Sequence, residues 1–320
     1  MTWRRPEAYA RPVDSLSPID RAAQAVAQAD ALLITAGAGM GVDSGMPDFR
    51  GGAGFWHAYP AAQKLGLAFE ELANPRWFRD DPALAWGFYG HRLNLYRETT
   101  PHAGFDLLRA WSERMPRGAF VYTSNVDGQF QRAGFAAERV VECHGSIHHM
   151  QCVDECGQEL WSVDVGVEVD TETLRAAAPL PGCPRCGGLA RPNILMFGDA
   201  TWDDRRSVEQ YGRYAQWQAE VRAARARVVV LECGAGKAIP TVRVQAQRMA
   251  RELGGLLVRI NVREHEVAAE HVGLAMGAKA ALTAINACMA ASRGSSRLAG
   301  YTVLGRGNAG MLRRGRGGAG

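Results

Sequence analysis

The chain has 320 residues, of which 47% are apolar and 22% charged, so it can bury the core of one large domain or of a large and a small one. It contains no run of about 18 apolar residues, which argues against a helical membrane protein, and its first residues lack an apolar signal segment. Seven cysteines in a chain of this length favour thiolate ligands over a disulfide scaffold, as in a reducing compartment. We therefore expect a cytoplasmic protein without a membrane partner.

The net charge of +4 at pH 7 originates in the C-terminal segment 292–320. This segment contains six arginines and no acidic residue, and it is rich in glycine and serine. Such a composition buries too little apolar surface to offset the entropy of ordering, so it predicts a disordered tail. The tail could bind nucleic acid or an acidic partner, but we favour a solvated tail and expect no other nucleic-acid contact. The sequence does not indicate the oligomeric state.

Predicted helices and strands alternate along most of the chain. Ser17 followed by Pro18 marks a helix start, since serine caps a helix and proline suits its first turn. Apolar, β-branched runs predict buried strands at 31–35, 119–123, 139–142, 227–232 and 255–261. Helical patterns lie between them at 102–114, 205–226 and 241–253. This alternation is typical of an α/β fold with a doubly wound, Rossmann-like parallel sheet.

Two stretches interrupt the alternation. Residues 52–98 are rich in aromatic side chains and have a helical pattern from Pro82 onward, whereas residues 146–195 contain four cysteines and little helical signal. We interpret both as insertions that form one smaller domain over the strand ends, where ligands bind in such folds. The predicted organisation is an N-terminal extension (1–17), a main domain (18–291) with its Rossmann-like part in 18–51, 99–145 and 196–291, a helical insertion (52–98), a cysteine module (146–195) and the tail (292–320).

A glycine-rich turn, Gly37-x-Gly39-x-Gly41, follows the first predicted strand. Glycines permit positive φ values and let backbone N–H groups approach a phosphate. Such turns are common, so this pattern alone is a weak indication of nucleotide binding. The loop that follows ends in Asp48-Phe49-Arg50, which places a carboxylate, a ring and a guanidinium side by side. These side chains could cover a bound sugar, or the charged pair could simply fix the loop.

Four cysteines have the spacing of a metal site. They are Cys152 and Cys156, then, after 26 residues, Cys183 and Cys186. Two such pairs can supply the four thiolates of a tetrahedral zinc ion. Four protein ligands leave no open position for a substrate or water, so the pattern predicts one structural Zn²⁺ rather than a catalytic one.

Polar residues follow two of the predicted strands. Asn125 and Asp127 come directly after the strand 119–123, and His144 follows the strand 139–142. A histidine at the carboxyl end of a strand can reach a cleft and act as a general base near neutral pH. An isolated histidine is more often hydrogen-bonded in a core, and His148 and His149 fit that description better than His144.

Together, these motifs resemble the sirtuin family of NAD-dependent protein deacylases. The matching segments are Gly37 to Gly39 with Ser44 to Arg50, Asn125 to Asp127, His144-Gly145, the four cysteines, Arg191 to Asp199, and Asn261. The resemblance extends from about residue 18 to residue 291.

The resemblance implies a deacylase that transfers the acyl group of acyl-lysine to ADP-ribose and releases nicotinamide. Its substrates would be acyl-lysine proteins, its co-substrate NAD, and its catalytic residues His144, as the base toward a ribose hydroxyl, and Asn125. The implied NAD-binding residues are Gly37, Ala38, Gly39, Asp48, Phe49, Arg50, Ser124, Asn125, Val126, Asp127, Gly234, Ala235, Gly236, Asn261, Val262 and Lys279. The implied substrate-binding residues are Tyr89, Arg92, Ile194, Phe197 and Gly198.

Several positions depart from the family pattern. The family's glutamine before Asn125 is Ser124, and the serine expected after the first glycine pair is Gly41. A Gly-Thr-Ser turn is replaced by Gly234-Ala235-Gly236, and the first cysteine pair has three intervening residues instead of two. These changes concern NAD geometry and rate more than family membership.

The acyl specificity is indicated by Tyr89 and Arg92, which resemble the pair that receives acidic acyl chains in the desuccinylase branch. Positions i and i+3 share a helix face, so a phenol and a guanidinium could bind a distal carboxylate together. The alternative is an ordinary amphipathic helix with a surface arginine. Two other functions remain open on the sequence: a sirtuin-like protein ADP-ribosyltransferase, and a non-catalytic NAD-binding module.

Overall fold

The computed structural model describes residues 16–47, 51–162 and 166–304. Its main sheet has six parallel strands in the order β3-β2-β1-β9-β10-β11. From β1 the chain builds the sheet outward through β2 and β3, and it then returns to the other side of β1 for β9, β10 and β11. The strand order therefore reverses between β1 and β9, and doubly wound folds bind ligands at this switch point. The strands are β1 (Ala31–Ala36), β2 (Ala119–Thr123), β3 (Val140–Glu142), β9 (Val228–Cys233), β10 (Leu256–Ile260) and β11 (Val272–Leu274).

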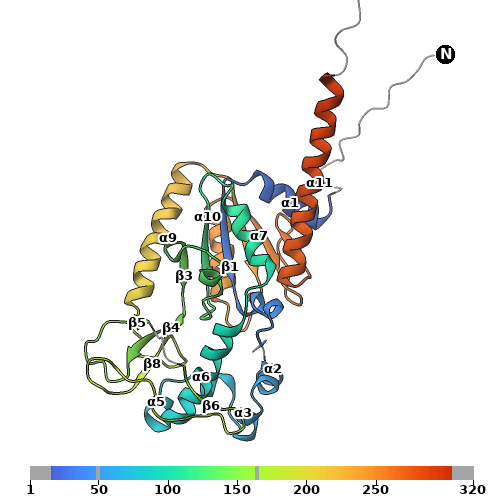
Figure 1. Ribbon diagram of the computed structural model, residues 1–320. Coiled ribbons are helices and arrows are strands. Elements are labelled where there is room, and N and C mark those ends of the chain that lie inside the picture. Colours follow the sequence, from blue (N-terminus) through green and yellow to red (C-terminus); the bar gives the residue numbers. More distant parts are fainter. Residues whose placement is uncertain (1–15, 48–50, 163–165, 305–320) are drawn as a thin grey trace, which may run out of the picture.

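Helices cover both faces of this sheet, as Figure 1 shows. Alternate residues of β1 divide between the two faces: Leu32 and Ile34 pack in one core with α1 (Pro18–Gln28), α7 (Ala103–Ser112) and α11 (Ala278–Leu304). Ala31 and Leu33 pack in the other core with α9 (Arg205–Ala223) and α10 (Thr241–Glu252). Strands buried on both faces explain why these runs are continuously apolar in the sequence.

The two insertions form one smaller domain, as predicted. Its single core joins side chains of the helical insertion with those of the cysteine module, and Trp86 Nε1 donates a 2.9 Å hydrogen bond to the carbonyl of Ala190. In Figure 1 this domain occupies the lower part of the molecule, below the main sheet. Its helices are α2 (Gly51–Ala58), α3 (Pro60–Lys64), α4 (Phe69–Leu72), α5 (Trp77–Asp80) and α6 (Pro82–Glu98). Its strands are β4 (Gly145–Cys152), β5 (Trp161–Ser162) and β8 (Ala190–Ile194), in the antiparallel order β5-β4-β8, and the pair β6 (Val169–Asp170) and β7 (Arg175–Ala176).

Short elements complete the described chain and connect the strands to the site. They are η2 (Ala38–Met40), η3 (Val42–Ser44), α8 (Gln129–Arg132) and η4 (Ala137–Arg139). The predicted helix start at Ser17 is confirmed: its side chain accepts a 3.2 Å hydrogen bond from Asp20 N–H, and Asp20 completes a capping box. Among the described residues, no helix is both long and apolar enough to span a bilayer.

The structure differs from the sequence prediction for one long helix and for several short elements. Helix α11 continues to Leu304, so the prediction of disorder from residue 292 onward is wrong for residues 292–304. The alanine-rich run before residue 292 favours helix and lets it propagate past the folded core. Strand β11 has three residues, and α2 to α5 have four to eight, which is too short for a periodic pattern to reveal.

Candidate active site and metal centre

Two glycine turns meet at the switch point of the sheet. Gly37 follows β1 and Gly234 follows β9, and Gly39 N–H donates a 3.0 Å hydrogen bond to the Gly234 carbonyl. A Cβ atom on Gly37 would lie 2.9 Å from Ala235 Cα, and one on Gly234, where φ is +66°, would lie 2.3 Å from the carbonyl carbon of Gly39. Both positions therefore require glycine because the two turns touch through their backbones.

A pocket of about 250 Å³ opens beside these turns. It lies at the carboxyl ends of the central strands, where the predicted residues Gly39, Gly234, Asn261 and Val262 come together. The other lining residues are Val42, Asp43, Ile260, Arg263, Met276, Gly277 and Ala278. Sequence reasoning did not find Asp43, Arg263 or Met276, because nothing in the spacing of their segments indicates that they converge.

Asn261 fixes one wall of the pocket. Its buried side chain donates a 2.7 Å hydrogen bond to the Ala235 carbonyl and accepts 3.0 Å bonds from the N–H groups of Arg263 and Glu264. The Ala235 carbonyl also accepts from Arg243, at 3.2 Å. The turn Gly234-Ala235-Gly236 is therefore held through a backbone carbonyl.

The loop after β2 connects this pocket to the smaller domain. Asn125 Nδ2 donates a 3.1 Å hydrogen bond to the Gly37 carbonyl, and Ser124 N–H donates to Ala36. On the other side, the Val126 carbonyl accepts from Ile147 N–H at 3.0 Å, and His148 Nε2 donates a 2.9 Å bond to the Asp127 carbonyl. The predicted residues 124–127 thus lie between the glycine turn and the segment that carries His144.

Asp127 is a buried carboxyl group. Burial raises its pKa to about 6, and the charge of Glu142 acts in the same direction. The N–H of Gln129, which donates a 2.9 Å bond to Oδ1, and the charge of Arg92 oppose this rise. At pH 7 the carboxyl group is therefore mostly ionised, but its pKa lies only about one unit below that pH.

His144 lies at the end of β3, partly exposed and bracketed by backbone contacts. Its carbonyl accepts a 3.0 Å hydrogen bond from Leu195 N–H. At Gly145, where φ is +78°, a Cβ atom would lie 2.0 Å from the Asn193 carbonyl oxygen, so β8 fits only against glycine. Burial lowers the pKa of His144, which leaves the imidazole neutral at pH 7 and able to accept a proton. The neighbouring His148 donates a hydrogen bond to a backbone carbonyl, and burial lowers the pKa of His149 to about 4. Both environments are typical of histidines that stabilise the fold rather than act as a base.

The segment after β8 is held by a buried ion pair. Arg191 and Asp199 are joined at 2.8 Å with side-chain exposures of 2% and 0%, and Asp199 also accepts from Met196 N–H. Ile194 is buried, whereas Phe197 is 38% exposed and donates its N–H to the Ala73 carbonyl. Phe197 packs edge-on against Phe69, with ring centroids 6.2 Å apart.

The predicted pair Tyr89 and Arg92 lies inside the smaller domain, not on its surface. Arg92 donates from Nε and Nη2 to Tyr96 Oη at 3.1 and 3.0 Å, and its guanidinium carbon lies 5.9 Å from the ring centre of Phe69. Burial holds the pKa of Tyr89 above its ordinary value, so its phenol stays a donor. Within the described part of the chain, that phenol oxygen has no hydrogen-bond partner.

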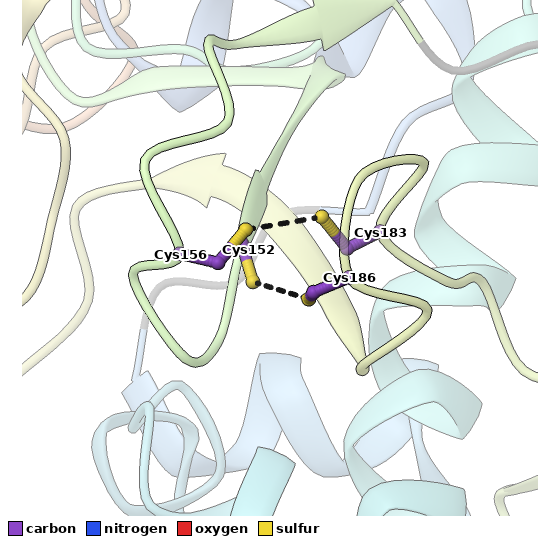
Figure 2. A group of neighbouring side chains, drawn as sticks. All are labelled: Cys152, Cys156, Cys183 and Cys186. Atoms are coloured by element: carbon purple, nitrogen blue, oxygen red, sulfur yellow. Dashed lines mark hydrogen bonds between the residues drawn. The ribbon is translucent and has the colours of Figure 1, made fainter.

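The four predicted cysteines form one cluster, as Figure 2 shows. Their Sγ atoms all lie within 4.8 Å of one another, and the pairs Cys152–Cys186 and Cys156–Cys183 are 3.7 and 3.6 Å apart. A tetrahedron of thiolates at the zinc–sulfur distance of about 2.3 Å has edges of about 3.8 Å. The donor set and its spacing therefore fit a structural zinc ion.

Four predicted residues stand apart from these contacts. Asp48, Phe49 and Arg50 lie outside the described residues. Lys279 is the second residue of α11, and its backbone N–H donates a 2.7 Å hydrogen bond to the Asp43 carboxylate, so it borders the pocket through the backbone.

A doubly wound sheet whose switch point opens into a glycine-lined pocket is the architecture of a dinucleotide-binding protein. Comparison with known proteins narrows this class. Residues 37–216 match the Sir2 family. The chain is 36% identical over 231 residues to NAD-dependent protein deacylase 2 of Pyrobaculum aerophilum, covering 72% of this chain and 79% of that protein. It is 34% identical over 244 residues to the NAD-dependent protein deacylase of Thermococcus kodakarensis, covering 76% and 84%.

The fold agrees with solved structures. A histidine-to-asparagine mutant of a Sir2 homologue in complex with ADP-ribose superposes with a TM-score of 0.63 at 25% identity, covering 85% of this chain and 97% of that one. The chain therefore belongs to the Sir2 family, the sirtuins. It is an NAD-dependent protein deacylase, with NAD as co-substrate and acylated proteins or peptides as substrates.

Proposed function

We propose that this deacylase binds NAD across the two glycine turns and uses His144 as the base toward a ribose hydroxyl. The observation that carries the proposal is the position of residues 124–127. They hydrogen-bond to the Gly37 turn on one side and to the segment after His144 on the other. A molecule that contacts Asn125 and Asp127 from the pocket would thus have its far end directed toward His144.

Each residue then has a defined task. The glycine turns offer backbone N–H groups to the pyrophosphate, and Asn125 and Asp127 hold the nicotinamide and its ribose. The neutral imidazole of His144 takes a proton from the ribose hydroxyl. The segment from Ile194 to Gly198, in which Leu195 and Phe197 are exposed, pairs with the backbone of the substrate peptide.

We further propose that the acyl pocket accepts acidic acyl groups such as succinyl or malonyl. Tyr89 offers a protonated phenol without a partner in the described chain, and Arg92 offers a guanidinium in a buried, aromatic setting. Phe69 contacts both Phe197 of the peptide-binding segment and Arg92, which connects the substrate strand to this pair. A carboxylate there would receive charge-assisted hydrogen bonds in surroundings of low dielectric.

Nicotinamide release with acyl-lysine peptides tests the proposed function. We expect the zinc-loaded enzyme to release nicotinamide from NAD only when an acetyl-lysine or succinyl-lysine peptide is present. The acyl-ADP-ribose product should appear in equal amount by mass spectrometry. Release without peptide, or ADP-ribose left on protein, would contradict the assigned chemistry.

The acyl preference is tested by Arg92→Met. This change removes the guanidinium but keeps an apolar chain among the rings, so we expect the kcat/KM for a succinyl-lysine peptide to fall about 10- to 100-fold, the equivalent of a charge-assisted hydrogen bond of about 1.5–3 kcal/mol. The kcat/KM for the acetyl-lysine peptide should change less than about threefold. Arg248→Met serves as the control, because Arg248 lies on the surface of α10 and is 52% exposed. Equal losses on both peptides would show that Arg92 is only structural.

A further inference from the structure

His102 connects helix α7 to the turn that lines the NAD pocket. It precedes α7 as its N-cap residue and is 6% exposed. Its ring Nδ1 accepts a 3.0 Å hydrogen bond from Gly104 N–H, and its Nε2 lies 3.0 Å from the Met40 carbonyl oxygen. Its backbone N–H donates a 3.0 Å bond to Ser44 Oγ.

These contacts allow one protonation state. The nitrogen that accepts from Gly104 N–H cannot itself carry a proton, and the nitrogen that faces a carbonyl must carry one. The ring is therefore the neutral Nε2–H tautomer. A second proton on Nδ1 would point at the Gly104 N–H and would break the cap of α7.

The ring has no room to turn away from this conflict. A Cβ atom on Gly104 would lie 2.5 Å from His102 Cε1, so the ring already lies directly against the backbone. The Phe105 ring packs against it with centroids 4.9 Å apart, and Met40 is fully buried. Protonation must therefore move the chain rather than the side chain alone.

The groups that face His102 come from three elements. Asp43 of η3 and Asp106 of α7 raise its pKa, and Lys279 at the start of α11 lowers it. Burial is the largest influence, and the pKa lies below the ordinary histidine value. The neutral form is thus favoured at pH 7 and is lost as the pH falls.

The residues that His102 holds surround part of the pocket wall. Met40 and Ser44 flank Val42 and Asp43, which line the pocket together with Gly39. Met40 N–H also donates to the Gly37 carbonyl at 2.9 Å, and Asp43 accepts from Lys279 N–H. Loosening the segment 40–44 would therefore disturb both the first glycine turn and the wall beside it.

We propose that His102 is a positioning residue for NAD binding: in its neutral form it holds the segment 40–44 against the pocket, and its protonation weakens the affinity for NAD. This inference rests on the assignment of the pocket to NAD in the proposed function. It makes His102 a pH-dependent element that does not touch the reacting atoms.

The test is NAD binding by calorimetry to the zinc-loaded full chain, without acyl peptide, at about pH 7.5 and about pH 5.5 on either side of the histidine range. The variant is His102→Asn, since asparagine also caps helices but does not titrate and is too short to reach Met40. The exposed His57 supplies a matched control, His57→Asn.

We expect the dissociation constant of the wild type to rise as the pH falls, more steeply than that of His102→Asn. At pH 7.5 the variant should bind about 3- to 10-fold more weakly, as expected for one lost hydrogen bond. His57→Asn should follow the wild type at both pH values. His102→Ser, another capping residue, should behave like His102→Asn if the effect is due to the lost imidazole.

Two results would overturn the inference in distinguishable ways. If wild type and His102→Asn bind NAD with the same affinity and the same pH dependence, His102 does not position the pocket, and the NAD assignment stands. If the wild type does not bind NAD, the pocket is wrongly assigned and the inference falls with it. The same holds if the variants Asn261→Ala and Gly234→Ala bind NAD with the affinity of the wild type.

Discussion

Replacing His144 with asparagine is expected to lower the kcat for deacylation by about 10²- to 10⁴-fold, the usual contribution of a general base. Asparagine is close to histidine in size and polarity, so the turn at Gly145 should keep its contact with β8. It cannot take a proton, however, and His144 is suited to that task because burial keeps its imidazole neutral at pH 7. The measurement is the rate of acyl-ADP-ribose formation with saturating NAD and peptide.

The pH profile gives a second readout of the same residue. A base whose pKa is lowered stays active to lower pH than an ordinary histidine, so the acid limb of kcat should lie below about pH 6.5. The control is His57→Asn, which replaces an exposed histidine of α2 and should leave kcat and its pH profile unchanged. If His144→Asn keeps more than half of the wild-type kcat, the base has been wrongly identified.

The main sheet was predictable from the sequence because its strands are covered on both faces. The runs 31–35, 119–123 and 227–232 differ from β1, β2 and β9 by at most one residue at either end. Continuous apolar, β-branched segments of this kind have few alternative structures. Strand β11 and helices α2 to α5 escaped prediction because they are short and owe their conformation to tertiary contacts.

The sequence predicted most of the residues of the site, but not the contacts between segments that are distant in the chain. The glycines at 37 and 234 are almost 200 residues apart, and their backbone contact depends on the neighbouring positions of β1 and β9 in the sheet. The sequence predicts a helix over 102–114, but neither the cap that His102 provides nor its bond to Met40 could be read from that pattern, because the bond depends on how α7 packs beside the turn. Contacts of this range leave no periodic signal in the chain.

One departure from the family pattern has a physical explanation. The turn Gly234-Ala235-Gly236 lacks two hydroxyls, yet the Ala235 carbonyl receives hydrogen bonds from Asn261 and Arg243. The backbone is fixed by these side chains, so the absence of the two hydroxyls does not loosen the turn, and in the proposed function it removes only contacts to NAD. We therefore expect the missing hydroxyls to change the affinity for NAD rather than the stability of the protein.

Removal of the zinc ion is expected to abolish activity although the metal does not take part in the reaction. Strand β4 begins at Gly145, beside His144, and ends at Cys152, a span of about 24 Å along an extended chain. Its partner β8 pairs with both ends of β4, with a shift of register between Ser146 and Met150, and β8 leads into the segment that we propose binds the substrate peptide. The four thiolates join the far ends of β4 and β8, where the described part of the segment between Cys152 and Cys183 forms strands of only two residues each.

Without the metal, the thiols of the two cysteine pairs are joined by weak sulfur–sulfur contacts of 3.6 and 3.7 Å in place of four zinc–thiolate bonds. We expect Cys183→Ser, or treatment with a chelator, to unfold the module, to lower the melting temperature, and to reduce deacylation below detection, because the folding free energy of such modules is largely metal-binding energy. Zinc content, circular dichroism and activity are measured on the same sample. Cys288→Ser is the control, since Cys288 lies on α11 and its thiol contacts Asp20 at 2.9 Å, away from the cluster. A protein shown to be zinc-free that keeps its full activity would mean that the β4–β8 hairpin is stable on its own, and that the cysteines have another role.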